Sequence, residues 1–297
     1  MKLTELLPKG IKYVENEPMS RHTTFRTGGP ADLLVMPSSV QELSETLCAF
    51  RRQGIKPTVI GNGSNLLVSD KGIRGAVIKI GEDLSDMTVC GETVTCGAGA
   101  HLNRLCVFAA ENGLSGAECL YGIPGTVGGA VYMNAGAYGS EIKDILKSVT
   151  YMDPDGVICE LAGTEGYGYR FSPFTGTDNI IAGASFGFVH GDKEAVTAKM
   201  TEIKERRAEK QPLNFPSAGS TFKRPEGYFA GVLIEQSGLK GRSVGGACVS
   251  EKHAGFIVNK GGATTGDILE LISIVQKQVY ADHGVILETE VKFVGEE

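Results

Sequence analysis

One arginine in the chain lies in surroundings that suit the binding of a negatively charged group. Arg170 stands between aromatic residues after a glycine-containing turn, within the segment 167–172. Its guanidinium is planar, always charged and able to hold a carboxylate by two parallel hydrogen bonds. We therefore expect Arg170 to bind a substrate carboxylate or to stabilise a developing oxyanion. An ordinary surface arginine is the alternative interpretation.

A serine in the last third of the chain has the neighbours of a proton donor. Ser220 follows a turn of small residues and precedes two cations, Lys223 and Arg224. Cations and main-chain amides can stabilise a transient alkoxide, and the same groups can bind a ligand phosphate. The pattern predicts a reactive or ligand-binding turn, and a simple turn with an N-cap serine remains the alternative.

The terminal segment 285–294 alternates apolar and polar residues, which predicts a strand with two different faces. The apolar face, which we expect in the core, comprises Val285, Leu287, Val291 and Phe293. The opposite face comprises Ile286, Glu288, Glu290 and Lys292. Two acids and one base on one face could take part in chemistry, or they could simply be solvated.

Two glycine-rich stretches predict a binding site for phosphate. The long stretch is 121–139 and the short one is 61–65, and both contain asparagine or serine. Such glycine density is entropically costly unless the backbone needs positive φ or a close approach. Main-chain N–H groups without side chains in the way commonly hold phosphates. We therefore expect a diphosphate held from two sides, with plain tight turns as the alternative.

The strict sequence motifs of nucleotide-binding and hydrolytic enzymes mostly fail. Leu66 and Leu102 occupy the positions where G-x-G-x-x-G requires its third glycine. The short glycine loop also lies between two strands, whereas a Rossmann loop opens a helix. Residues 183–187 match G-x-S-x-G, but the sequence continues as a strand, so Ser185 is not expected to be a hydrolase nucleophile.

Composition limits the class of protein. The chain has 297 residues, of which 41% are hydrophobic and 22% are charged, and its formal net charge of −6 argues against a general nucleic-acid surface. Its 7 cysteines are scattered without a C-x-x-C pair, so we expect reduced thiols and no metal site. No apolar run is long enough to span a bilayer, and the N-terminus lacks a signal sequence, so a cytoplasmic protein is expected.

Periodicity predicts an α+β fold with its main boundary at about 193–212. The predicted helices are 39–54, 101–112, 194–209, 228–236 and 264–279. The first begins with the capping pattern Ser39-x-x-Glu42 and the last with Thr264-x-x-Asp267. The predicted strands are 57–60, 75–80, 92–96, 148–153, 157–161, 180–189, 256–258 and 285–294. We place one domain at 1–200, with subdomains of about 1–82 and 83–200, and a second at 201–297.

Taken together, these segments resemble the UDP-N-acetylenolpyruvoylglucosamine reductases, flavoenzymes of bacterial cell-wall synthesis. The resemblance covers nearly the whole chain in order, at 21–31, 61–66, 121–139, 169–170, 217–225, 251–259 and 287–291. It implies a two-subdomain FAD-binding region of the vanillyl-alcohol-oxidase (PCMH) type and a smaller substrate domain. The short C-terminal part resembles the form that lacks an extra tyrosine-bearing loop. Cys248 stands where the resemblance predicts glutamine.

The resemblance also implies a reaction and the residues that perform it. NADPH would reduce FAD, and reduced FAD would give a hydride from N5 to UDP-N-acetylglucosamine enolpyruvate, forming UDP-N-acetylmuramate for peptidoglycan. Ser220 would protonate the enolic carbon, and Arg170 and Glu290 would polarise the substrate carboxyl and stabilise the enolate-like intermediate. Glu290 could help only while it holds or shares a proton, which burial would favour.

The binding residues follow from the same motifs. Those expected at FAD are Ile60, Gly61, Asn62, Gly63, Ser64, Asn65, Leu66, Gly122, Pro124, Gly125, Thr126, Gly128, Gly129, Ala130, Asn134, Gly136, Ala137, Tyr138 and Ile181. Those expected at the substrate are Lys223, Arg224, Asn259 and Lys292. The expected partners are small molecules, with neither nucleic acid nor membrane, and the chain is expected to be a monomer or weak oligomer.

Two other functions remain open at this point. A different FAD oxidoreductase of the same fold, acting on a small alcohol, would share the glycine loops but would not need Ser220, Arg170 and Glu290 together. A nucleotide-sugar-binding module without turnover would need neither flavin nor NADPH.

Overall fold

The computed structural model describes residues 2–296 and divides them into two compact units. Among these residues, unit 1 comprises 2–15, 33–62 and 75–206, and unit 2 comprises 16–32, 63–74 and 207–296. Unit 2 also takes two N-terminal segments that we expected in the FAD-binding region. Long-range hydrogen bonds explain this, since Ser69 N donates to Val294 O at 2.9 Å and Asn259 Nδ2 to Phe25 O at 3.0 Å.

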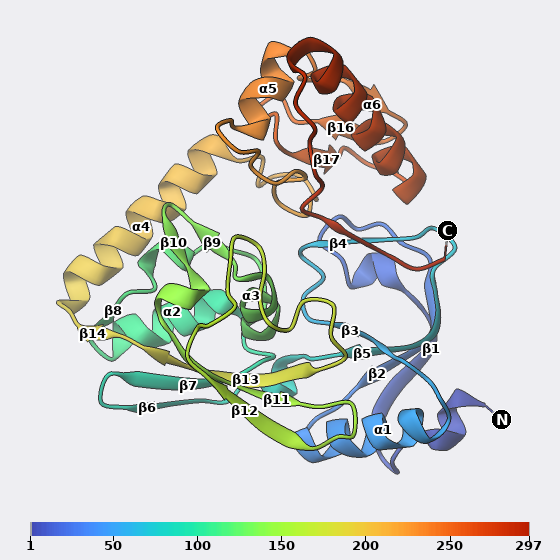
Figure 1. Cartoon of the computed structure of the whole chain (residues 1–297), viewed down its shortest axis with the longest axis vertical. Coiled ribbons are helices and arrows are strands. Elements are labelled where there is room, and N and C mark those ends of the chain that lie inside the picture. Colours follow the sequence, from blue (N-terminus) through green and yellow to red (C-terminus); the bar gives the residue numbers. More distant parts are fainter. Residues whose placement is uncertain (1, 297) are drawn as a thin grey trace. The chain divides into compact units, whose positions relative to one another are not determined.

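The N-terminal part of the chain forms a four-stranded sheet of order β1-β2-β5-β3 and the helix α1 (Figure 1). The strands are β1 (Lys12–Pro18), β2 (Pro30–Met36), β3 (Thr58–Ile60) and β5 (Ile73–Lys79). β3 and β5 pair in parallel, with Thr58 opposite Val77. α1 (Val40–Arg52) begins as its sequence predicts, because Ser39 Oγ accepts the Glu42 amide at 3.1 Å.

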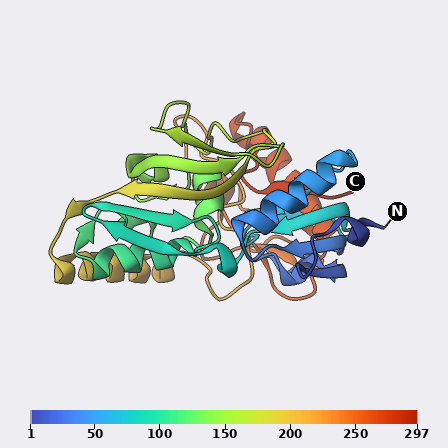
Figure 2. The ribbon, with the colours of Figure 1, turned by 90° about the horizontal axis from the view of Figure 1, so that it is seen from below.

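The larger sheet of unit 1 has the order β12-β11-β13-β7-β6, and all its neighbours are antiparallel. Its strands are β6 (Met87–Cys90), β7 (Thr93–Gly97), β11 (Leu146–Met152), β12 (Ile158–Ala162) and β13 (Ile180–Gly187). The accompanying helices are α2 (Leu102–Glu111), α3 (Val127–Met133) and α4 (Lys193–Lys210). Figures 1 and 2 show the five strands as one twisted layer.

Short elements connect these parts. The two-residue strands β8 (Leu114–Ser115) and β14 (Val189–His190) pair with each other, and β9 (Gly136–Ala137) pairs with β10 (Ser140–Glu141). The 3-10 helices are η1 (Leu3–Leu6), η2 (Met19–Arg21), η3 (Glu82–Leu84), η4 (Glu118–Leu120) and η5 (Ile142–Asp144).

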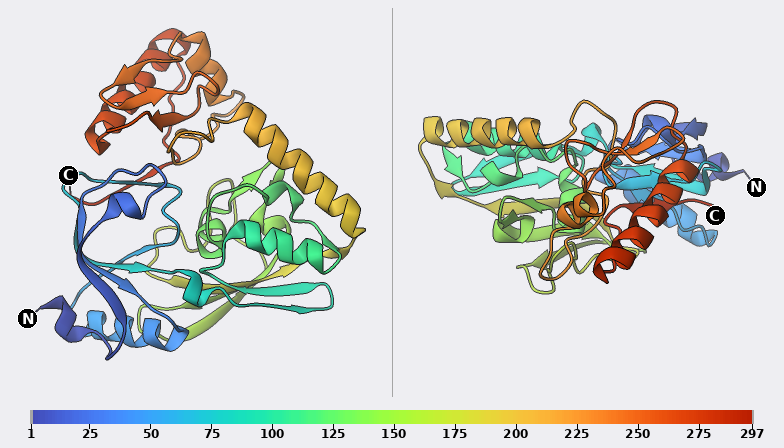
Figure 3. Two further views of the ribbon diagram at one scale, coloured as in Figure 1. Left: turned by 180° about the vertical axis from the view of Figure 1, so that it is seen from behind. Right: turned by 90° about the horizontal axis from the view of Figure 1, so that it is seen from above.

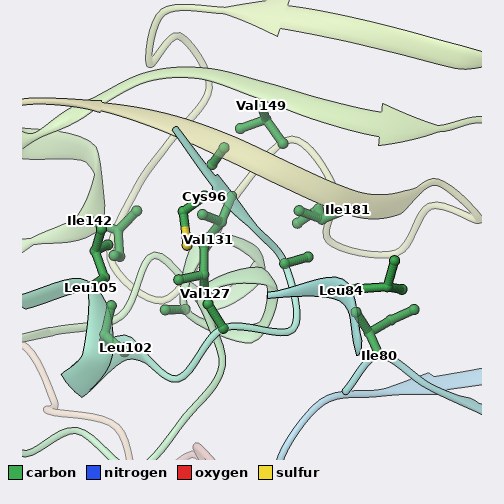
Figure 4. Packing of buried hydrophobic residues seen from close by; sticks show 14 of the residues in the cluster. Ile80, Leu84, Cys96, Leu102, Leu105, Val127, Val131, Ile142, Val149 and Ile181 are labelled. Carbon is green, nitrogen blue, oxygen red and sulfur yellow. The ribbon is translucent and has the colours of Figure 1, made fainter. Parts of the chain in front are cut away.

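The core of unit 1 lies between the large sheet and its helices. Val127 and Val131 of α3 are fully buried and lie among side chains of α2 and the sheet (Figure 4). Cys96 and Cys106 belong to the same cluster, and burial raises the pKa of each thiol to about 12. Both thiols are therefore packing groups and not nucleophiles.

α3 corrects the sequence-based expectation that 121–139 is a continuous loop. Two adjacent glycines disfavour a helix by propensity, which is why the sequence does not predict one. Thr126 nevertheless caps the helix, since its hydroxyl accepts the Gly129 amide at 3.3 Å. Gly128 also has to be glycine, because a β-carbon there would lie 2.9 Å from the Ala98 side chain. Packing of α3 against the sheet thus overrides the local preference.

Unit 2 has a small sheet of order β15-β16-β17 against which α6 packs (Figure 3). The elements are α5 (Ala230–Gln236), β15 (Ser243–Val244), β16 (Ala247–Val249), β17 (Ile257–Asn259) and α6 (Thr265–His283). β18 (Lys292–Val294) pairs in parallel with β4 (Leu66–Val68). α6 carries the capping box that its sequence predicts, and the Thr264 amide holds the pKa of Asp267 below its usual value.

The terminal strand is shorter than its alternation predicts. Only Lys292–Val294 forms a paired strand, and upstream of it Thr289 makes one isolated antiparallel bridge to Phe222. Leu287 and Val291 are buried as expected, but Phe293 is 39% exposed, so its placement in the core is wrong. The reason is that β18 forms a two-stranded sheet with β4, which covers neither Lys292 nor Phe293, so both side chains are exposed.

No helix within residues 2–296 has the length and apolar character needed to cross a bilayer.

Candidate active site

The two glycine loops predicted to hold a diphosphate meet in the structure, although about sixty residues separate them. A β-carbon at Gly61 would overlap the Thr126 hydroxyl, so the backbones approach more closely than any side chain permits. Asn62 Nδ2 donates to Pro124 O at 3.5 Å. Glycine at 61 is thus required by contact with the second loop.

The short loop keeps main-chain donors available for a ligand. Within the described chain, the amides of Asn62, Gly63 and Ser64 donate to no protein acceptor. Gly63 adopts φ +61°, the left-handed region that glycine enters without strain. Successive amides in such a turn form an anion-binding concavity, so these residues fit the diphosphate of a dinucleotide cofactor.

The long loop differs from this expectation, because the protein itself uses most of its amides. Val127 N donates to Ala100 O at 2.7 Å, Gly128 N to Ala98 O at 2.8 Å, and Gly122 N to Asn103 Oδ1 at 2.6 Å. Gly122 and Gly128 therefore allow this stretch of backbone to pack closely against other segments of unit 1.

We predict that Gly61→Ala weakens cofactor retention. The new methyl group must displace the Thr126 hydroxyl that caps α3, at a cost of about 1–3 kcal/mol for overpacking. Purified Gly61→Ala should show a lower ratio of flavin to protein absorbance and a lower melting temperature than the wild type. Gly81→Ala is the matched control, since no heavy atom lies within 4 Å of a β-carbon there. Equal flavin content in the two variants would contradict the prediction.

Arg170 lies at the tip of a tight turn in unit 1. Gly168 and Phe171 exchange two main-chain hydrogen bonds of 3.0 and 3.1 Å, with Tyr169 and Arg170 between them. Arg170 has φ +54°, which is unusual for a residue with a long side chain. Its guanidinium donates to Gly136 O at 3.2 Å and lies 4.9 Å from the Tyr169 ring centroid. The cation is therefore held in place by its contacts, which also maintain the strained backbone conformation of Arg170.

Tyr167 begins this segment and is partly buried in unit 1. Its hydroxyl is buried without a hydrogen-bond partner in the described residues. Burial raises the pKa of Tyr167 to about 12, so the phenol holds its proton at neutral pH.

The segments that carry Ser220 and Glu290 lie side by side in unit 2. Glu290 N donates to Thr221 O at 2.8 Å, and Lys223 N donates to Glu288 O at 2.9 Å. The segment that follows Ser220 therefore runs antiparallel to 288–290. Asn65 Nδ2 donates to Glu290 O at 3.1 Å, and Lys292 N to Asn65 O at 2.9 Å, so the end of the short glycine loop also joins this group.

The four residues expected at the substrate have different surroundings. Lys223 pairs with Glu288 at 3.0 Å, and Arg224 lies 3.9 Å from the Phe229 ring centroid. Lys292 is exposed. Asn259 is buried, and its side chain bonds to Phe25 O, Gly261 N and Ala263 N. The Asn259 side chain thus joins segments of unit 2.

Sequence reasoning missed three of the contacts that shape the site. Phe229, 58% exposed, lies against Arg224, and Ser172 donates to Tyr132 O at 2.7 Å. Asn134, which the sequence places only in the long glycine-rich stretch, donates from Nδ2 to Gly168 O in the turn that carries Arg170. No local pattern in the sequence signals these contacts. Ser185 lies within β13 and shares a hydrogen bond with Thr95, so the strand-turn-helix of a nucleophile elbow is absent there.

Comparison with known proteins first defines the class. Residues 31–162, which contain both glycine loops, match the family model of the FAD binding domain. Phl p 4.0202, a glucose dehydrogenase, shares the fold with a TM-score of 0.50 at 12% identity, over 64% of this chain and 44% of that one. The chain is therefore an FAD-binding protein with an α+β fold of this type.

Its family follows from closer relatives. Residues 211–294 match the C-terminal domain of UDP-N-acetylenolpyruvoylglucosamine reductase. The enzyme of that name from Syntrophomonas wolfei is 48% identical over 98% of this chain and 97% of its own length, and that from Caldanaerobacter subterraneus is 49% identical over 99% and 97%. The crystal structure of the Thermus caldophilus reductase superposes with a TM-score of 0.82 at 37% identity, covering 96% of this chain and 98% of that one. The chain belongs to the UDP-N-acetylenolpyruvoylglucosamine reductase family.

Proposed function

We propose that this protein reduces UDP-N-acetylglucosamine enolpyruvate to UDP-N-acetylmuramate, with NADPH as the reductant, in the synthesis of peptidoglycan precursors. The observation that carries the proposal is a full-length family relationship in a chain that also contains the candidate residues Ser220, Arg170 and Glu290. FAD, when bound, takes a hydride from NADPH and passes it to the enolpyruvyl double bond.

The roles of the three side chains follow from the charge that this addition creates. A hydride added to the terminal carbon leaves negative charge on the neighbouring carbon and on the carboxylate. We propose that Arg170 stabilises this charge, because its fixed guanidinium requires little reorganisation during the reaction. Ser220 would give its proton to the carbanionic carbon, and Glu290 in its protonated form would polarise the carboxyl.

The same proposal assigns the remaining polar groups. The amides of Asn62, Gly63 and Ser64 would hold the FAD diphosphate. The diphosphate of the UDP-sugar would be neutralised by Lys223, Arg224 and Lys292. The exposed ring of Phe229, which lies against Arg224, would stack on the substrate. We also propose that the enzyme is cytoplasmic and that it is a monomer or weak oligomer.

Anaerobic spectroscopy of the two half-reactions tests this proposal. The purified protein should be yellow, NADPH should bleach it, and UDP-N-acetylglucosamine enolpyruvate should restore the colour. A colourless protein that cannot be reconstituted with FAD would exclude a flavoenzyme. Bleaching of the oxidised flavin by a small alcohol, without recolouring of the reduced flavin by the enolpyruvyl substrate, would instead identify an alcohol-oxidising enzyme of the same fold.

A further inference from the structure

The turn that carries Arg170 is attached to the C-terminal end of α3 by three hydrogen bonds. Ser172 Oγ donates to Tyr132 O at 2.7 Å, Asn134 Nδ2 to Gly168 O at 2.8 Å, and the Arg170 guanidinium to Gly136 O at 3.2 Å. The bonded residues are therefore every second residue of 132–136 on one segment and every second residue of 168–172 on the other. All of these residues lie within unit 1.

Asn134 is the central residue of this attachment. It is 0% exposed and adopts φ +43° and ψ +55°, where asparagine is tolerated better than most residues. Its side-chain oxygen accepts the Lys143 amide at 3.0 Å, and its side-chain nitrogen donates to Glu141 Oε2 at 3.0 Å as well as to Gly168 O. Both N–H donors of the amide are thus engaged inside the protein.

The acceptor Gly168 O lies at the base of the Arg170 turn. The same carbonyl also accepts the Phe171 amide at 3.1 Å, which closes the turn. Because Arg170 itself adopts φ +54°, the turn needs outside contacts to keep this conformation. Aspartate, similar in shape, would place an anion against both the Gly168 carbonyl and the Glu141 carboxylate.

We propose that Asn134 is a positioning residue for the reduction of the substrate, acting through Arg170 by fixing the turn on which the guanidinium is carried. The inference rests on the proposed function of Arg170. Both N–H donors of the Asn134 amide are engaged within the protein, so Asn134→Asp tests this task and not a hydrogen bond donated to FAD. Ser172 supports the same turn, because its hydroxyl donates to Tyr132 O.

Rapid kinetics of the holoenzyme tests the inference. Asn134→Asp should lower the rate at which the enolpyruvyl substrate reoxidises reduced flavin by about 10- to 100-fold, the range expected for a catalytic group displaced by about 1 Å. FAD content and the rate of flavin reduction by NADPH should change less than about twofold. Ser172→Ala should act in the same direction, and it keeps the test informative if Asn134→Asp fails to fold. Asp144→Asn is the control, since Asp144 bonds to the Glu141 amide and not to the turn.

A double-mutant cycle separates positioning from general damage. If Asn134 acts through Arg170, then Asn134→Asp should add little to the loss already caused by Arg170→Lys. Fully additive losses, equal losses in both half-reactions, or unchanged reoxidation in both turn variants would overturn the inference. If Arg170→Lys itself leaves reoxidation unchanged, the proposed role of Arg170 fails instead, so the two failures are distinguishable.

Discussion

Ser220→Ala should remove most of the substrate half-reaction while leaving the NADPH half-reaction intact. Proton donation by a positioned side chain contributes about 100- to 10,000-fold to a rate, and alanine has no proton to give. We expect reoxidation of reduced flavin by the enolpyruvyl substrate to fall within that range. Stopped-flow absorbance of the flavin, recorded separately with NADPH and with substrate, measures both steps.

The matched control for this change is Ser243→Ala. Ser243 is an exposed serine of unit 2 whose hydroxyl donates to Gly241 O at 3.1 Å, so it tests the removal of a serine hydroxyl elsewhere in the unit. It should leave both half-reactions unchanged. Equal loss of both half-reactions in Ser220→Ala would argue against a proton donor and for a structural role of the Ser217–Thr221 turn.

Arg170→Lys should lower the same half-reaction by about 100- to 1,000-fold, the loss seen when one preorganised donor to a developing oxyanion is removed. Lysine retains the charge but cannot reproduce the planar fork that binds a carboxylate by two hydrogen bonds. Because this charge develops only as the hydride is added, the maximal reoxidation rate should fall more than substrate affinity. Single-turnover reoxidation at several substrate concentrations separates the two effects.

The control here is Arg51→Lys, which alters an exposed pair with Asp155 at 2.8 Å in the same unit. Exposed ion pairs contribute little, so neither half-reaction should change. If Arg170→Lys raised only the substrate concentration needed for half-maximal rate, then Arg170 would contribute to binding and not to stabilisation of the intermediate.

Local signals predicted each α-helix of the described residues except α3, but they predicted no strand at β1 or β2. Ser39 and Thr264 predict the starts of α1 and α6, because each side chain caps its helix by accepting the main-chain amide three residues later. Helical spacing placed α2 and α4 to within a few residues. These predictions are confirmed because each rests on interactions within one element.

Elements whose stability comes from distant partners were missed or misjudged. α3 is formed by glycine-rich sequence that packs on the large sheet, and Phe293 is exposed because β18 pairs only with β4 in a two-stranded sheet. Segments 16–32 and 63–74 belong to unit 2 through hydrogen bonds to residues far along the chain. Pattern and propensity carry no information about such contacts.

The sequence by itself determined the chemical groups, their order along the chain and the family to which they belong. Arg170, Ser220 and Glu290 could be chosen as catalytic candidates because arginine, serine and glutamate have distinct chemistry in their local settings. Only the tertiary structure showed that the Thr126 side chain leaves no room for a side chain at Gly61, and that Asn134 donates a hydrogen bond to the turn of Arg170. The physical reason is that these contacts join residues 34 to 65 positions apart, and only the folded chain brings such residues within hydrogen-bond distance.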